Sequence, residues 1–116
     1  MNVDFTRGHL TIVVSPVDLR AGYRRLSLIA RTLLGIAVED GGHFVAFVSR
    51  DRALCKVIWS DEAGSSVLTR RLHRGRFERF LVEASRPEIK RTMTPKDFID
   101  FLDGRKIFRS PVPIYL

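Results

Sequence analysis

Runs of apolar and polar residues divide the chain into short strands joined by turns. Leu10–Val14 and His43–Val48 are apolar at nearly every position, as expected of strands buried on both faces. Leu54–Trp59 is apolar except for Lys56, and after a polar turn the chain can return antiparallel to it. We therefore predict an antiparallel meander with one further strand, 10–14, at an edge; its three strands are 43–48, 54–60 and 65–72.

The polar turn inside this meander is Ser60–Gly64, where Gly64 suits the left-handed position of a short hairpin loop. Beyond the meander, Ile89–Met93 predicts a last strand. A further short apolar segment lies between them and consists of Phe77, Phe80, Leu81 and Val82.

Apolar residues at helical spacing predict one longer helix over 16–34. Ser15 would cap this helix, Pro16 would occupy its first position, and Gly35 would end it. Gly22 weakens the middle, so the segment can instead divide into a short turn followed by a helix over 23–34.

A second, shorter helix is predicted over 95–103, with Thr94 as its cap and Gly104 as its end. Two prolines keep the tail, residues 105–116, extended. The fold class is therefore α+β: a single domain over 1–116, with a small antiparallel sheet packed mainly on one face by the longer helix. The short C-terminal helix would close one end.

Charge adds a candidate partner to this fold. The 20 lysines and arginines outnumber the 13 acidic residues, for a net charge of +7. Residues 1–47 contribute a net +1, and residues 48–116 contribute +6. Such asymmetry favours a polyanion, most simply nucleic acid, although a basic surface that only keeps the protein soluble is the alternative.

The composition also bears on the compartment. One cysteine, Cys55, cannot form an internal disulfide, which favours a reducing cytoplasm. The start of the sequence lacks the pattern of a secretory signal, and no apolar run reaches the roughly 20 residues of a membrane helix. We expect a cytoplasmic protein with no membrane partner, and oligomeric state is left open.

The densest positive charge follows the predicted hairpin. Arginine suits phosphate because its planar fork can bond two oxygens at once. Alternatively, the arginines that follow the hairpin form a solvated face and pair weakly with Asp61, Glu62 and Glu78. The candidate nucleic-acid-binding residues, to which Lys56 and Arg20 are added, are Arg70, Arg71, Arg74, Arg76 and Arg79.

Three of the surrounding residues have competing explanations. Asp18 is best explained as a helix cap, and Arg20, two positions later on a helix, need not pair with it. Arg20 is then free to hold a partner or to pair with Asp61. Trp59 is expected in the core, because stacking on a base would require it to be exposed beside the arginines.

The sequence gives little support to an enzyme. A nuclease needs carboxylates that converge on metal ions, and Asp18, Asp61 and Asp103 each have a structural explanation. The histidines are scattered, and Cys55 is flanked by apolar residues, as a buried inert thiol would be. We predict no catalytic residue, no metal site and no cofactor.

Several motifs occur in a family-like order: V-D-L-R-A-G-Y-R-R-L (17–26), H-F-V-A-F-V (43–48), K-V-I-W-S-D-E-A-G (56–64), R-R-L-H-R-G-R-F (70–77) and a helix begun by Thr-Pro (94–103). The set resembles the TnpB accessory proteins of the insertion sequence 66 family of bacterial transposons, which are distinct from the RNA-guided nucleases of the same name. Departures from the family pattern are Ser60 for a second Trp, Glu62 for Gly, and Glu78-Arg79-Phe80 for Pro-Trp-Pro.

The resemblance implies a non-catalytic accessory role in DNA transposition, beside a transposase and other transposon-encoded proteins. Combined with the charge, it suggests that the basic end of the hairpin contacts DNA phosphates, the transposase or both. The alternative is a protein–protein adaptor that does not bind DNA directly.

Overall fold

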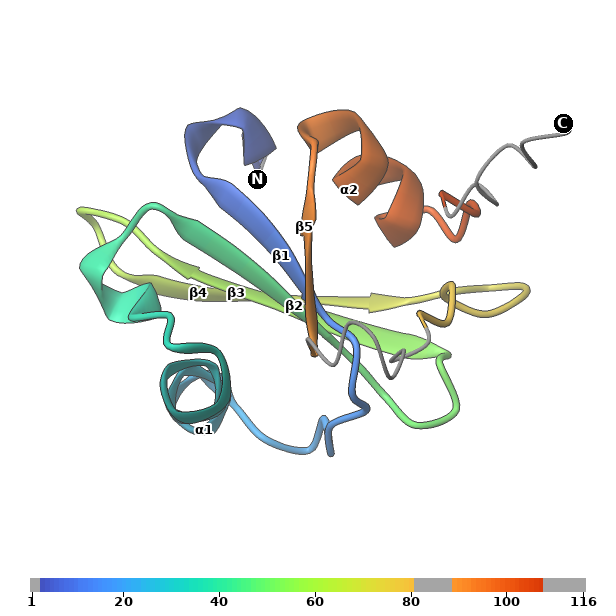
Figure 1. Cartoon of the computed structure of the whole chain (residues 1–116), viewed down its shortest axis with the longest axis horizontal. Helices are drawn as coiled ribbons and strands as arrows, with labels where there is room; N and C mark the ends of the chain where they lie inside the picture. Colours follow the sequence, from blue (N-terminus) through green and yellow to red (C-terminus); the bar gives the residue numbers. More distant parts are fainter. Residues whose placement is uncertain (1–2, 81–88, 108–116) are drawn as a thin grey trace, which may run out of the picture.

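The computed structural model describes residues 3–80 and 89–107, which form one five-stranded sheet with helices on both faces (Figure 1). The elements are β1 (His9–Val13), α1 (Tyr23–Ile29), its π-helical continuation η2 (Ala30–Leu34), β2 (His43–Val48), β3 (Leu54–Ser60), β4 (Ser65–Arg71), β5 (Lys90–Met93) and α2 (Pro95–Leu102). Two short 3-10 turns, η1 (Phe5–Arg7) and η3 (Val38–Asp40), complete the set.

The strand order is β4-β3-β2-β1-β5. The predicted meander β2-β3-β4 is confirmed and antiparallel throughout. Strand 10–14 joins the meander at its β2 edge, as predicted, but β1 runs parallel to β2 and is paired on its other side with β5. β1 is buried at four of its five positions because each of its faces packs into one of the two cores, while β2 and β5 pair its two edges.

Each face of the sheet has its own core. One face packs under α1, η2 and η3, with Phe47 and Ile58 at its centre, and the other packs under α2. On that second face Phe77 stacks on Phe101 of α2 with ring centroids 5.4 Å apart. The expectation that the C-terminal helix closes one end is therefore wrong, because α2 lies over a face, opposite α1 (Figure 1).

The longer helix begins at Tyr23 rather than at Pro16, so the alternative division at Gly22 is the one observed. Residues before it are held in other ways. The Val17 amide donates to the Val48 carbonyl at 3.1 Å, and the Asp18 carboxylate accepts from the Arg20 amide at 3.0 Å. These bonds draw the segment against the end of β2 and leave no helical turn around Ser15. Gly35, left-handed at φ 68°, ends the helix as predicted.

The short helix follows its sequence signals closely. The Thr94 hydroxyl accepts from the Asp97 amide at 3.2 Å, Pro95 is the first helical residue, and Phe98 and Phe101 are fully buried. Gly104 follows with φ 79°. Local capping chemistry therefore determines both ends of α2.

The turn between β3 and β4 differs from the prediction in its chemistry. Gly64 does not adopt the left-handed conformation expected of it. Instead the Asp61 carboxylate accepts from the amides of Ala63 and Gly64 at 2.9 and 3.1 Å, which closes the turn through a side chain. Asp61 thus has a structural duty in this turn.

Two predictions fall outside the described residues. These are the apolar positions Leu81 and Val82, and most of the extended tail, since description ends at Ile107. Within 3–80 and 89–107, no helix combines the length and apolar character needed to cross a membrane.

The junction of η1 with β1 provides a stability prediction. A Cβ on Gly8 would lie 2.7 Å from the Gly42 carbonyl oxygen, where the parallel pairing of β1 and β2 begins. We expect Gly8→Ala to lower the free energy of unfolding by about 1–3 kcal/mol, as overpacking against backbone does. Denaturant unfolding measures this change.

The matched control is Gly64→Ala, because a Cβ there meets no atom within 4 Å. It should leave the midpoint of unfolding unchanged or slightly raised. Equal destabilisation by the two substitutions would contradict the close approach of Gly8 to Gly42.

Candidate nucleic-acid interface

The exit of β4 lies against the turn that joins β2 to β3. Register places Arg71 opposite Leu54, and beyond it the Leu72 amide donates to the Ala53 carbonyl at 3.2 Å. The Phe77 amide then donates to the Arg52 carbonyl at 2.8 Å. Backbone hydrogen bonds thus hold residues 72–77 beside residues 49–53, although the two segments lie far apart in the sequence.

This arrangement gathers arginines from two segments at one end of the sheet. Arg71 and Arg76 both act electrostatically on Asp51 in the β2–β3 turn. Arg79 lines the same hollow as Arg50 and Arg52. All but the half-buried Arg52 are exposed. We call the following set the basic end: Arg50, Arg52, Arg71, Arg74, Arg76 and Arg79.

Few of these guanidinium groups form a hydrogen bond or an ion pair within the described residues. The Arg76 guanidinium donates to the neighbouring Gly75 carbonyl at 3.0 Å. Among the described residues, no hydrogen bond or ion pair is formed by the other five side chains of the basic end. Asp51, whose pKa is lowered mainly by hydrogen bonds from Ser49 and Ala53, is occupied in holding its own turn.

Arg70 does not belong to this group. It points to the opposite face from Arg71, as neighbouring strand residues do, and reaches the C-terminal end of α2. Its Nε donates to the Leu102 carbonyl at 3.1 Å, and its Nη2 lies 3.0 Å from an Asp103 carboxylate oxygen. A cation at a helix C-terminus satisfies carbonyls that the helix leaves unpaired. Arg70 therefore fastens α2 to the sheet.

Lys56 and Arg20 also have partners within the chain. Lys56 Nζ donates to the Ala21 carbonyl at 3.0 Å, just before α1 begins. Arg20 pairs with Asp18, its Nη2 2.8 Å from a carboxylate oxygen, and this pairing lowers the pKa of Asp18 to about 2. The expectation that Asp18 and Arg20 need not pair, and the alternative of an Arg20–Asp61 pair, are wrong because this segment is not helical.

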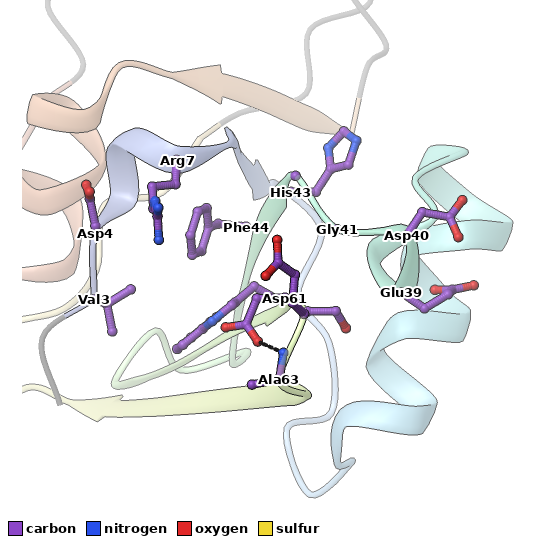
Figure 2. A pocket seen from close by; sticks show the side chains of 14 residues that line it. Val3, Asp4, Arg7, Glu39, Asp40, Gly41, His43, Phe44, Asp61 and Ala63 are labelled. Carbon is purple, nitrogen blue, oxygen red and sulfur yellow. Dashed lines mark hydrogen bonds between the residues drawn. The ribbon is translucent and has the colours of Figure 1, made fainter.

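The opposite end of the sheet is acidic. An open hollow of about 950 Å³ lies beside the β3–β4 turn, with Phe44 and Trp59 among its lining residues (Figure 2). Arg7 is the one arginine or lysine among the described residues that line it. The carboxylates around this hollow, which we call the acidic end, belong to Asp4, Glu39, Asp40, Asp61 and Glu62.

The two ends lie too far apart for the arginines of the basic end to form the surface salt bridges with Asp61 and Glu62 that were the alternative to phosphate binding. Asp61 and Glu62 stand at the acidic end and cannot pair with Arg74 or Arg76 at the basic end. Glu78 stays close to the basic end but accepts a hydrogen bond from the Ile107 amide. Asp61 and Glu62 therefore do not neutralise the basic end.

The candidate catalytic carboxylates do not converge. Asp18 holds Arg20, Asp61 closes the β3–β4 turn, and Asp103 pairs with Arg70. Within the described ranges no group of three or more His, Cys, Asp or Glu side chains is placed to hold a metal ion. Cys55 is buried and its pKa is raised to about 12 by burial, which suppresses the thiolate.

Trp59 lies in the core, as predicted, where its ring centroid is 5.6 Å from that of Phe44. It is 7% exposed and stands near the acidic end, so it cannot stack on a base held by the arginines. Contact through the basic end would therefore not include stacking on Trp59.

The sequence alone does not indicate that Arg50 and Arg52 belong to the basic end. They read as parts of a connecting turn, because a whole hairpin separates them from Arg71 along the chain. The available signal was the meander itself, in which the first turn and the end of the third strand share one end of the sheet. Arg52 is also the one non-glycine residue with positive φ in the described chain, at 61°.

Comparison with known proteins identifies relatives of this chain. A family model described as IS66 Orf2 like protein matches residues 8–110. The uncharacterized protein y4hO of Sinorhizobium fredii (strain NBRC 101917 / NGR234) is 44% identical over 66 residues, which span 57% of this chain and 56% of that protein. No solved structure matches the chain.

Arg52 yields a prediction that separates stability from binding. A left-handed conformation costs a residue with a Cβ roughly 1–2 kcal/mol, and glycine adopts it freely at some entropic cost. We expect Arg52→Gly to raise the free energy of unfolding by about 0.5–1 kcal/mol while removing one cation of the basic end. Chemical denaturation measures the first effect.

Arg50→Gly is the paired control, since it removes an arginine from the same turn at a position without positive φ. It should lower stability, as glycine does at an ordinary position. A loss of stability in Arg52→Gly equal to that in Arg50→Gly would show that the left-handed Arg52 stores no strain.

The role of Arg70 gives a second prediction. Arg70→Ala removes the bonds to Leu102 and Asp103, and we expect it to lower the free energy of unfolding by about 1 kcal/mol. Arg74→Ala should change it by less than about 0.5 kcal/mol, because no such bond is lost. Thermal unfolding of the two variants, side by side, tests whether the two arginines have different duties.

Proposed function

Since the chain belongs to the IS66 Orf2-like family of transposon proteins, whose role in DNA transposition is an accessory one, we propose that it performs this role by holding DNA phosphates with its basic end. The bound DNA would serve as the substrate of a separate transposase. The chain itself would carry out no chemistry, and it would act in the cytoplasm.

The observation that carries this proposal is the set of arginines that two turns present at one end of the sheet. The side chains of five of the six form no hydrogen bond or ion pair within the described residues, so their guanidinium groups are available without breaking the fold. Each cation that neutralises a phosphate releases a condensed counterion, which favours binding at low salt. Arginine adds a planar fork that matches two phosphate oxygens.

The arrangement of the basic end also favours contact with the DNA backbone over contact with the bases. Arg50 and Arg52 belong to a tight turn, and Arg74 and Arg76 flank Gly75, which is left-handed at φ 73°. Phosphate contacts from such turns hold a protein in place on the duplex but read no sequence. Specificity for the transposon ends would then come from the transposase.

We assign a smaller role in DNA contact to Arg70, Lys56 and Arg20 than their place in the sequence suggests. Each has a partner within the chain, at Asp103, Ala21 and Asp18 respectively. We propose that they shape the surface, while Arg71, Arg74, Arg76 and Arg79 contact phosphate together with the two arginines of the β2–β3 turn.

A second candidate function is a protein–protein adaptor for the transposase. The observation in its favour is the outer face of the 23–34 helix, where Leu28 and Leu33 are both 58% exposed. Covering apolar side chains of this size with a partner lowers the free energy of the complex. Binding through this face would depend little on salt, in contrast to binding through the basic end.

The salt dependence of DNA binding tests the proposal. We expect wild-type protein to bind a labelled duplex more weakly as salt rises. Arg71→Ala/Arg74→Ala should lower affinity for every duplex sequence. It should also reduce the slope of log affinity against log salt by about two, roughly one for each lost phosphate contact. Fluorescence anisotropy over a salt series gives both quantities.

The matched control is Arg7→Ala/Arg31→Ala, which removes the same charge at the other end of the sheet. Arg7 lines the acidic hollow, and Arg31 pairs with Glu39 beside it. This variant should retain nearly wild-type affinity. Equal losses in both variants would mean that only net charge matters, and no binding by folded wild type at low salt would leave the adaptor as the function.

A further inference from the structure

β4 is the outermost strand of the sheet and pairs with β3 alone among the described elements. Two backbone hydrogen bonds show which amides and carbonyls of the strand point toward β3. The Leu72 amide and the Gly64 carbonyl both bond toward the β3 side, at Ala53 and Asp61. Because successive residues of a strand point to opposite sides, the amides and carbonyls of Ser65, Val67, Thr69 and Arg71 point outward.

The outer edge of β4 is exposed, and no strand within residues 3–80 and 89–107 pairs with it. The same four residues are exposed, with Val67 at 40%. Natural sheets protect such edges with charge, proline, bulges or a covering element, because an unpaired edge is a template for another strand. Here β4 contains no proline, its charges are confined to its last two residues, and its middle is Val67-Leu68-Thr69. Val67 and Thr69 are β-branched, and such residues favour strand pairing.

We propose that β4 pairs with β4 of a second copy of this chain, antiparallel and centred on Leu68, to give a dimer with one continuous sheet. In this register Ser65 lies opposite Arg71 of the second copy, and Val67 lies opposite Thr69. All four outward-facing residues then exchange hydrogen bonds, which a shift of one residue would forbid and a shift of two would reduce. No arginine faces another arginine across the new pair, so like charges are kept apart.

Charge complementarity selects a second copy as the occupant of this edge. β3 and β4 are antiparallel, so the acidic end and the basic end stand at opposite ends of β4. A two-fold axis through Leu68 brings the Asp61–Glu62 turn of one copy to the end of the sheet where Arg74 and Arg76 of the other emerge. The same attraction occurs twice, as an interface with two-fold symmetry requires.

The dimer does not depend on DNA, and it can be tested without it. Val67 and Thr69 are exposed on the α1 side of β4, so substitutions there leave both core clusters intact. Val67→Glu/Thr69→Glu would place two glutamates opposite each other at two points of the interface. Val67→Lys/Thr69→Glu differs only in the sign of the charge at position 67 and would replace both repulsions with attractions. Both variants carry the same glutamate at position 69, opposite Lys56 of its own chain, so this pairing does not distinguish them.

Sedimentation velocity across a concentration series is the measurement. We expect wild type to dimerise, Val67→Glu/Thr69→Glu to raise the dissociation constant at least tenfold, and Val67→Lys/Thr69→Glu to return it close to wild type. The first variant also lowers the net charge of +7, which would ease repulsion between copies, so weaker association cannot come from net charge. Circular dichroism and thermal unfolding establish that each variant is folded.

Two outcomes would overturn the proposal: wild type that stays monomeric at its highest soluble concentration, or association that is equal in the two variants. Cross-linking tests the register separately. In Val67→Cys/Thr69→Cys, mild oxidation should join position 67 of one copy to position 69 of the other, as peptide mapping would show, while the buried Cys55 stays unreacted. Links that join 67 to 67 instead would reject pairing centred on Leu68.

Discussion

The pairing of β3 with its two neighbours is the constraint on which the rest of this molecule depends. β3 alternates between two cores, with Cys55, Val57 and Trp59 toward α2 and Ile58 toward α1. Its register with β4 also decides which charges stand together, because it brings the exit of β4 to the turn that precedes β3. Packing of the core and polarity of the surface therefore follow from one set of backbone hydrogen bonds.

The arginines of this chain divide into two kinds by what lies within their reach. Arg70 and Arg20 meet carboxylates or carbonyls supplied by the fold, and each helps to hold a segment in place. Arg71 and Arg74 extend from the sheet end, where Asp51 is already bonded to its own turn. Net charge alone does not distinguish these cases, although it is what first suggests a polyanionic partner.

Arg52 combines a structural role of its backbone with a side chain that belongs to the basic end. Its left-handed backbone is unfavourable for an arginine, yet its carbonyl accepts from Phe77 and so connects the turn to the segment after β4. Glycine would suit the conformation better, and the residue present instead adds a cation to the basic end. Strained backbone conformations of this kind cluster at functional sites.

The sequence by itself determined the features that depend on near neighbours. The strands 43–48 and 54–60, the Thr94 cap and the Gly35 and Gly104 helix ends follow from local periodicity, capping and backbone conformation. Only the tertiary structure decided the place of β1 inside the sheet, the duty of Arg70 at α2 and the entry of Arg50 and Arg52 into the basic end. Each of these requires a contact between residues far apart in the chain, and such contacts depend on strand order and register. The apolar pattern limits both but does not specify them.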